Sequence, residues 1–548
     1  MKRTAALIVV SLLCASSPLL AADLATDQQA VHVLNRLGYG PRPGDVERVK
    51  QMGVERYIDS QLHPESIPMP QDLEARLKSL ETVSWSAGDA LRQFNELRKE
   101  VRNEDEGAKQ KRRLVLGKMN REAADARLLR AIDSPRQLQE VMVEFWFNHF
   151  NVFAGKGVDR ALITSYERDA IRPFAMGSFR ELLGATAHHP AMLYYLDNVV
   201  STSSAYGEQL ARRGNKGPRG LNENYARELM ELHTLGVDGG YTQKDVTELA
   251  RMLTGWTYQP QRMVRFNENF SFDPRRHDQG VKTWLGRTVQ PSGQREGEMA
   301  LDVLAVHPAT AHHISFQLAQ YFVSDNPPPA LVDRMAKTWL ATNGDIRSVL
   351  KTLFTSDEFM APQTAGAKFK TPYQFVISAV RASGVEVTNV QPLLGAMTQL
   401  GMPLYGCQTP DGYKNTQEAW LNPDALTRRI TFATALGSGR MALSGPLADQ
   451  QQRQAMSASA ALPARAMADG EMMPPAGAVA PAANPPMVTN TVAANAMAAA
   501  AAAQPLDPAR LQATLDGSLS PRTLGLVASN PPDLRAAMLL GSPDFMQH

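Results

Sequence analysis

Residues 222–236 read NENYARELMELHTLG, and this stretch has a helical pattern and is the most informative of the chain. On a helical wheel at about 100° per residue, its apolar residues form one broad arc. His233 falls near the middle of this arc and Glu228 just inside one edge, whereas Arg227 and Glu231 lie outside it. We therefore expect two ionisable groups to point toward the core, where an unpaired charge is costly.

Two interpretations of Glu228 and His233 are open on this pattern. In the structural interpretation, Glu228 pairs with an arginine or binds backbone amides, and His233 is a neutral histidine of the core. In the functional interpretation, Glu228 is a general base or a metal ligand facing a pocket, with Glu231 one turn away. Arg251 lies on the next predicted helix and is a candidate partner for Glu228.

Helical periodicity extends over most of the chain. The fold class predicted is mainly α, a multi-helix globular body with at most a small β element. Thr242 and Asp245 have the spacing of a capping box, and they start the second helix of a predicted hairpin. Residues 263–288 are the best candidate for the β element. The clearest helical segments are 44–62, 134–150, 224–235, 242–254, 301–323 and 372–383.

The first 22 residues have the order of a secretory signal peptide. Lys2 and Arg3 precede an apolar run over 5–13, and small residues at Ala21 and Ala22 follow. The run is shorter than the about 20 residues that span a bilayer, and Leu13 stands where a lipobox needs a small residue. We therefore expect cleavage without lipidation and a periplasmic or secreted protein, with no later transmembrane segment.

Cysteine content and net charge narrow the function classes. Removal of the signal peptide leaves Cys407 as the single cysteine, so an intrachain disulfide is excluded for the mature chain. A net charge of +2 over 548 residues makes a nucleic-acid partner improbable, because such binding depends on a strong basic field.

Composition divides the chain into four parts. After the signal peptide (1–22), residues 23–455 are predicted to form the helical body. Residues 456–505 are rich in Ala, Pro and Met and almost free of charge after Glu471, which is typical of a disordered insertion. Apolar periodicity returns over 506–548, and this tail is predicted to be helical and to pack on the body.

The histidines do not stand at a recognised zinc spacing, and the chain has no nucleophile elbow, Walker loop or dinucleotide fingerprint. His149 ends a strongly apolar helix, and His277 lies in a loop rich in charged residues. A divalent-metal site built from His149, Glu228 and His277 is chemically sensible, because imidazole and carboxylate are common ligands of such ions. It requires three distant segments of the chain to converge.

Several blocks together resemble the bacterial family called domain of unknown function 1800 (DUF1800), and they span nearly the whole mature chain outside the insertion. The most specific are NENYARE and the LTGW within ARMLTGW. The blocks are HVLNRLGYG (32–40), FWFNHF (145–150), HPAMLYYLDN (189–198), NENYARE (222–228), YTQKDV (241–246), ARMLTGW (250–256), HDQGVK (277–282) and LGSPDF (540–545).

This resemblance implies an exported, helix-rich protein without a settled activity. It also implies a link with a second secreted family, domain of unknown function 1501 (DUF1501), which is similar to sulfatases and phosphatases. His233 stands where relatives commonly carry an aromatic residue, which argues against a catalytic role for it. The family's tryptophan-containing block is altered here over 407–420.

Two functions are consistent with these observations. The first is a periplasmic hydrolase, acid/base or metal-assisted, whose pocket holds His149, Asn224, Arg227, Glu228 and His277. In it Glu228 is base or ligand, Arg227 binds an anionic group with its planar guanidinium, and the histidines are ligands or acids. The alternative is a non-catalytic scaffold or binding partner of a secreted sulfatase/phosphatase-like protein, in which the same residues form a buried structural network.

Overall fold

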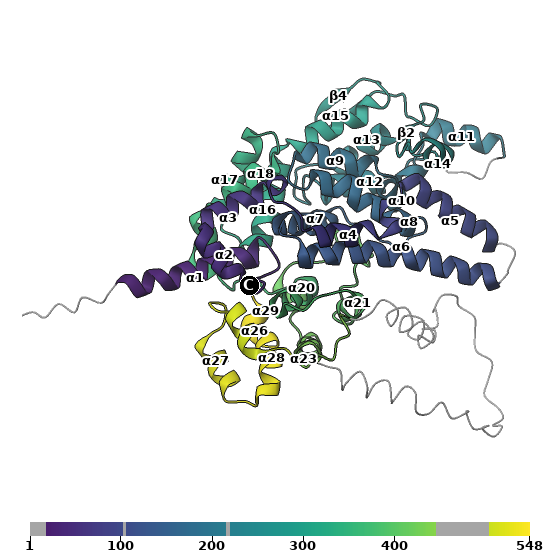
Figure 1. Cartoon of the computed structure of the whole chain (residues 1–548). Helices are drawn as coiled ribbons and strands as arrows, with labels where there is room; N and C mark the ends of the chain where they lie inside the picture. Colours follow the sequence, from purple (N-terminus) through teal and green to yellow (C-terminus); the bar gives the residue numbers. More distant parts are fainter. Residues whose placement is uncertain (1–17, 102–105, 215–219, 445–503) are drawn as a thin grey trace, which may run out of the picture.

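The computed structural model describes residues 18–101, 106–214, 220–444 and 504–548. Helices dominate these residues and the strands are few and short, which confirms the predicted mainly α fold class (Figure 1). The N-terminal third contains α1 Pro18–Arg36, α2 Asp45–Met52, α3 Val54–Leu62, α4 Gln71–Lys78, α5 Ala87–Val101 and α6 Glu106–Asp133.

The middle of the chain adds the helices that later form the site. These are α7 Gln137–His149, α8 Asp159–Ser165, α9 Phe179–His188, α10 Pro190–Tyr195, α11 Ser204–Arg212, α12 Asn224–Glu231, α13 Gln243–Leu253, α14 Pro260–Phe266, α15 Arg295–Ala305, α16 Pro308–Phe322, α17 Pro329–Ala341, α18 Ile346–Phe354 and α19 Asp357–Met360. A π-helical turn, Tyr166–Ile171, follows α8 directly.

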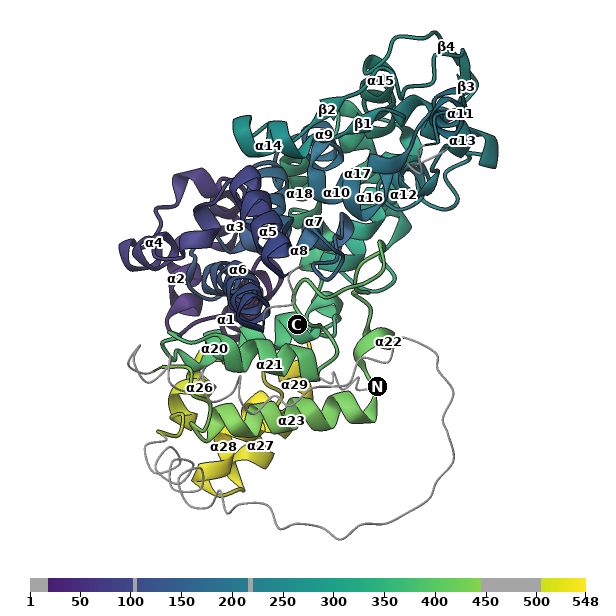
Figure 2. The same ribbon diagram turned by 90° about the vertical axis from the view of Figure 1, so that its right-hand side faces the viewer.

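Helix α7 is the centre of the body. Almost all of its side chains are buried, including those of Glu140 and Glu144, so the helix has no solvent-facing side. An all-round buried helix must be covered by neighbours on every side. Figure 2 shows α7 in the interior of the body, and Trp146 at its C-terminal half is completely buried and donates to the Ala175 carbonyl at 2.8 Å.

The C-terminal part packs onto this body through α20 Pro372–Ser383, which is also buried along nearly its whole length. The other helices here are α21 Gln391–Gln399, α22 Gln417–Trp420, α23 Pro423–Gly437, α26 Pro508–Thr514, α27 Pro521–Ala528, α28 Pro532–Leu540 and α29 Pro543–Met546. Helix α28 packs along α23, and both views place them at one side of the molecule. The chain end pairs with residues 368–370 through backbone bonds from Lys368 and Lys370.

The β structure consists of two antiparallel pairs. Strand β1 Trp256–Thr257 pairs with β2 Ser271–Phe272, and β3 Lys282–Trp284 pairs with β4 Arg287–Val289. The small β element expected over 263–288 is therefore present, but residues 263–266 belong to α14 instead. Met263 is buried within that helix, so its apolar side chain reports core packing rather than a strand.

The predicted helical hairpin is present as α12 and α13. Thr242 and Asp245 form the capping box reciprocally, as their spacing predicted. Helix α12 ends at Glu231 rather than at 235, because the chain turns tightly and reaches φ +84 at Gly236. Eleven residues, 232–242, separate Glu231 from the start of α13 at Gln243, so the hairpin loop is longer than its sequence pattern indicated.

Parts of the sequence-based description fall outside these residues. Residues 1–17 of the predicted signal peptide and 456–503 of the predicted insertion are not among those described. Within the described ranges, none of the helices has both the length and the apolar character needed to cross a membrane.

Candidate functional site

A cavity of about 260 Å³ lies between α7 and α16, and we call it the α7–α16 cavity. The turn after α12 and the segment 402–415 complete its wall. Its polar lining residues are Glu144, Asn148, His149, Glu231, His313, Gln317, Gln320, Tyr321, Thr371, Asp411, Tyr413, Lys414 and Asn415. Among the described residues, this concentration of titratable side chains around one hollow makes it the best candidate for a site.

Helix α16 supplies one wall through a regular spacing. His313, Gln317 and Tyr321 follow each other at four-residue intervals, which places them on one face of the helix. Most of the other buried residues of α16, such as Ile314 and Leu318, are apolar. The polar row therefore faces the cavity while the adjacent apolar row holds the helix in place.

His313 presents an unused ring nitrogen. Its Nε2 is buried and has no hydrogen-bond partner among the described residues. Burial lowers the pKa of His313, and a hydrogen bond to the Leu232 carbonyl opposes this shift. Because Nε2 is without a partner, that bond uses Nδ1, which leaves a lone pair on Nε2. A neutral imidazole of this kind can accept a proton.

Gly236 makes room for this ring. A Cβ at Gly236 would lie 2.8 Å from Nδ1 of His313, closer than side-chain carbons approach. The residue also has φ +84, which L-residues with a side chain rarely adopt. The glycine is required twice here, once for the turn and once for the position of His313.

His149 lies beside His313 at the end of α7. Its Nε2 is 3.2 Å from the His233 carbonyl, and because a carbonyl only accepts, the ring donates there. Burial lowers the pKa of His149 to about 3, the nearby His313 adds to this effect, and bonds to His233 and Gln317 oppose it. His149 is therefore neutral and acts as a donor to the backbone.

Glu144 is the buried carboxyl of the cavity. Tyr321 donates to its Oε2 at 2.9 Å. Burial raises the pKa of Glu144, while the positive charge of Arg127 and the hydrogen bond from Tyr321 partly offset this rise. A carboxyl group with a raised pKa can carry a proton into the range where acid catalysis is useful.

The segment 402–415 is clamped over the cavity by Asn148. The Asn148 amide donates to the Tyr413 carbonyl at 2.8 Å and accepts from the Tyr413 N–H at 2.7 Å. Asp411 and Lys414 form an ion pair at 2.7 Å on this segment. Burial acts to raise the pKa of Asp411, but hydrogen bonds from Lys414 and Thr409 hold this pKa below its usual range.

Glu228, the residue favoured by the sequence, is half-buried next to this site. Burial raises its pKa, and the negative charge of Glu231 adds to the effect while Arg227 opposes it. Glu231 lines the cavity, whereas Glu228 is not among the lining residues of this cavity. Arg251 does not pair with Glu228, because it binds Glu248 and Asp278 instead.

Arg227 and Asn224 have structural contacts of their own. The Arg227 guanidinium reaches Glu223 at 3.4 Å and donates to the Gln243 side chain at 2.9 Å, which joins α12 to α13. Asn224 is exposed and donates to the Leu196 carbonyl at 3.4 Å. Neither side chain lines the α7–α16 cavity.

His233 is buried, and burial lowers its pKa well below the usual value.

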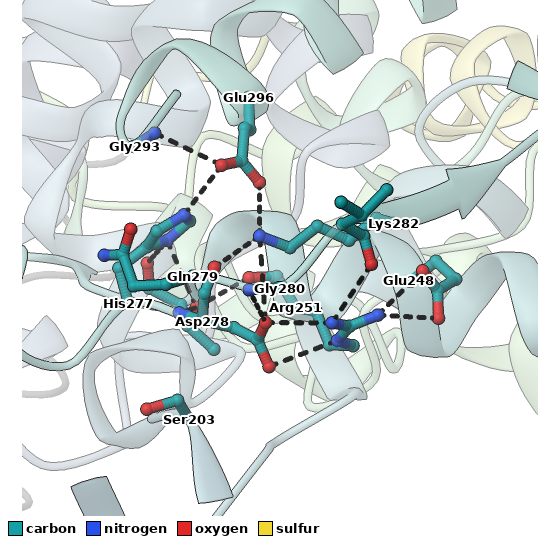
Figure 3. A network of polar contacts seen from close by, with 12 residues as sticks. Ser203, Glu248, Arg251, His277, Asp278, Gln279, Gly280, Lys282, Gly293 and Glu296 are labelled. Carbon is teal, nitrogen blue, oxygen red and sulfur yellow. Dashed lines mark hydrogen bonds and ion pairs between the residues drawn. The ribbon is translucent and has the colours of Figure 1, made fainter. Parts of the chain in front are cut away.

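His277 belongs to a different part of the molecule. Figure 3 shows His277 beside Glu296 in a polar network. Its Nε2 lies 3.0 Å from Oε1 of Glu296, and its Nδ1 lies 2.8 Å from the Thr254 carbonyl oxygen. Lys282 pairs with the other oxygen of Glu296 at 2.6 Å. The side chains of His277, Lys282 and Glu296 are all 0% exposed.

The structure does not bring His149, Glu228 and His277 together as metal ligands. Both ring nitrogens of His277 are occupied by Glu296 and Thr254, and His149 is bound to the His233 carbonyl. Over the described ranges there is no group of three or more His, Cys, Asp or Glu side chains arranged to hold a metal ion. The predicted three-residue site thus required a convergence that the packing does not provide.

Sequence reasoning identified His149 but missed Glu144 and His313. A signal for each was present in the sequence. Glu144 interrupts the apolar run 141–147, and His313, Gln317 and Tyr321 repeat every four residues along one face of α16. A polar residue at a core position of a helix is costly unless it has a partner or a function.

Comparisons with known proteins identify the family of this chain and nothing further. No curated protein and no solved structure matches this chain. A family model described as "Protein of unknown function (DUF1800)" matches residues 32–547. This match covers the cavity, the buried network and the C-terminal helices, and the chain therefore belongs to the DUF1800 family.

Proposed function

We propose that this chain is an exported hydrolase that uses acid–base catalysis in the α7–α16 cavity. The observation that carries the proposal is the pairing of two groups in that cavity. His313 has a buried Nε2 with a free lone pair, and Glu144 is a carboxyl whose pKa burial raises. Titratable groups whose surroundings push them toward opposite roles are typical of acid and base catalysts.

The proposed reaction divides the work between these two side chains. Nε2 of His313 accepts a proton from a water molecule, and the water oxygen forms a bond to an electrophilic carbon of the substrate. The bond from that carbon to the leaving oxygen or nitrogen breaks, and Glu144 donates its proton to the leaving atom. Return of the proton from His313 to Glu144 through solvent restores both groups.

Variants of the two residues test the proposal. The protein is assayed with chromogenic carboxylic esters and glycosides and with peptide substrates, in all of which water attacks carbon. His313→Gln and Glu144→Gln are each expected to reduce kcat by about 10² to 10⁴-fold. His312→Gln is the matched control, because His312 precedes His313 but is exposed and faces Asp333 at 4.0 Å.

The control variant is expected to keep wild-type activity. Turnover that survives in both His313→Gln and Glu144→Gln contradicts the proposed roles. Absence of turnover with every substrate class contradicts the hydrolase itself.

Export is part of the same proposal and rests on the N-terminal pattern of basic, apolar and small residues over 1–22. Expression of the full chain in a Gram-negative host, followed by fractionation and N-terminal sequencing, tests it. The mature protein is expected in the periplasm, beginning at Ala22 or Asp23. Retention in the cytoplasm with an intact Met1 contradicts export.

A second candidate is a scaffold or binding partner of a secreted DUF1501-type protein. It is favoured by the structural use of residues predicted for the site, since Arg227 joins two helices and His277 lies in a closed network. Co-purification of the tagged chain with a DUF1501-type protein from an envelope fraction supports it. A monomer that is active alone argues for the enzyme.

A further inference from the structure

A chain of hydrogen bonds connects the cavity carboxyl to the start of a distant helix. Tyr321 of α16 donates to Oε2 of Glu144 on α7 at 2.9 Å and accepts from Nε2 of Gln374 on α20 at 3.1 Å. The three residues are 6%, 6% and 8% exposed, so water competes little for these bonds. We call this set the Gln374–Tyr321–Glu144 chain.

The amide of Gln374 is oriented by its role in the helix cap. Thr371 and Gln374 form the capping box of α20, in which the Thr371 N–H donates to Oε1 of Gln374 at 2.9 Å. An N–H donor must face the carbonyl oxygen of the amide, which assigns Oε1 to Thr371 and Nε2 to Tyr321. The amide group therefore acts as a donor toward the phenol.

The direction of the next bond follows from proton count. The Tyr321 hydroxyl carries a single proton. Its oxygen accepts from Gln374, so its proton is available for Oε2 of Glu144. Oε2 is occupied as an acceptor of the Tyr321 proton, so Oε1 is the oxygen left free of this bond to carry a transferable proton.

We infer that Tyr321 and Gln374 are positioning residues for Glu144, which hold one carboxyl oxygen and leave the other to carry the transferable proton. This inference rests on the proposed function, in which Glu144 donates that proton. It also accounts for the presence of three polar side chains in an apolar core, where burying each of them costs free energy that its hydrogen bonds must offset.

The surroundings of Glu144 determine the expected sign of a perturbation. Its charged and titratable neighbours are Arg127 on α6, Tyr321 on α16, Tyr373 on α20 and Tyr39 after α1. Burial raises the pKa of Glu144, whereas Arg127 and the Tyr321 bond lower it. Loss of the Tyr321 hydroxyl therefore raises the pKa of Glu144 further.

The test measures the titration of Glu144 without any substrate. The protonated carboxyl stretch is followed by infrared spectroscopy against pH, and the Glu144→Gln spectrum is subtracted to isolate this group. Tyr321→Phe is expected to raise the midpoint by about one pH unit, the size typical of losing a hydrogen bond to a carboxylate. Gln374→Met frees the phenol to rotate and is expected to give a smaller rise.

Tyr39→Phe is the matched control. Tyr39 is a buried phenol that also donates to α7, but to the Glu140 backbone carbonyl at 3.2 Å rather than to a carboxyl. Its removal is expected to lower stability similarly and to leave the Glu144 midpoint unchanged. If Tyr321→Phe moves the midpoint no more than Tyr39→Phe does, the inference is overturned.

The activity assay separates this inference from the proposed function. With a turned-over substrate, the alkaline limb of the kcat profile is expected to move upward in Tyr321→Phe by the same amount as the infrared midpoint. A midpoint shift in a protein that hydrolyses nothing supports the hydrogen-bond chain and contradicts the hydrolase. An active enzyme whose alkaline limb stays fixed contradicts the positioning role.

Discussion

Glu296 contacts the buried Lys282 ammonium and the buried His277 ring, and its replacement by glutamine is a direct test of what this network contributes to stability. Its Oε2 is 2.6 Å from the Lys282 ammonium and its Oε1 is 3.0 Å from the His277 ring (Figure 3). The Ser292 and Gly293 N–H groups also donate to Oε1, where the chain enters α15. Glutamine keeps the shape and one acceptor oxygen but removes the charge.

The magnitude follows from the separation of the charges. At an effective dielectric constant of about 20, charges 2.6 Å apart interact with about 6 kcal/mol. Relief of the desolvation of Glu296 offsets part of this loss, and Asp278, with Oδ1 3.8 Å from Lys282, retains some attraction. We expect Glu296→Gln to lower the free energy of unfolding by about 3 to 5 kcal/mol, the range for removing one partner of a buried pair.

Urea unfolding followed by tryptophan fluorescence measures this change. Trp284 is completely buried on β3, two residues from Lys282, and reports on the same region. Glu106→Gln is the control, because Glu106 is 85% exposed and pairs with Lys109 on the surface. The control is expected to change the free energy of unfolding by less than about 0.5 kcal/mol.

A double variant checks the physical cause. Lys282→Met combined with Glu296→Gln removes the unpaired cation, and it is expected to recover part of the loss seen in Glu296→Gln alone. A decrease below about 1 kcal/mol in the single variant would refute the reasoning, since it would mean that water already screens the network. A double variant less stable than the single one would likewise count against an unpaired Lys282 as the cause.

Two further predictions follow from the site and the network. Gly236→Ala is expected to displace His313 and to reduce kcat on the order of 100-fold. Gly240→Ala is the control, because Gly240 also has a positive φ but a Cβ there would have nothing within 4 Å, and this variant is expected to keep the wild-type kcat. Equal losses of kcat in the two variants would assign the effect to backbone strain. Bonds from His277, Lys282 and the Ser292 N–H lower the pKa of Glu296 despite its burial. The stabilisation by Glu296 is therefore fully present above the unfolded pKa of about 4.3 and is lost as pH falls through the lower folded pKa. The difference in unfolding free energy between wild type and Glu296→Gln should shrink as pH falls below about 4.3, and a constant difference would contradict this prediction.

Local patterns predicted the features that depend on neighbouring residues. The capping box of Thr242 and Asp245 is present, because a cap needs only side chains three residues apart. His233 is buried as predicted, but it lies in the turn after α12, so its burial comes from tertiary packing and not from the helical period. The end of α12 was placed four residues too late, because Leu232 and Leu235 continue the apolar pattern into the turn at Gly236.

The partners of charged side chains were the least predictable part. Arg251 was predicted as a candidate partner of Glu228, but in the structure it binds Glu248 and Asp278. His149 and His277 were both predicted to be metal ligands, yet His149 borders a cavity and His277 is bound by Glu296 in a separate buried network. These choices depend on contacts between segments far apart in the chain, which periodicity does not encode.

The sequence by itself determined the mainly α class and the helices whose faces must be buried, because helical period and capping are local properties. The family followed from short sequence blocks. Only the tertiary structure decided which polar residues share a hollow. It places His313 of α16 and Glu144 of α7, 169 positions apart by their numbers, in the wall of one cavity, and it encloses His277 elsewhere. The physical reason is that the cost of burying a polar group is set by the partner that packing brings to it.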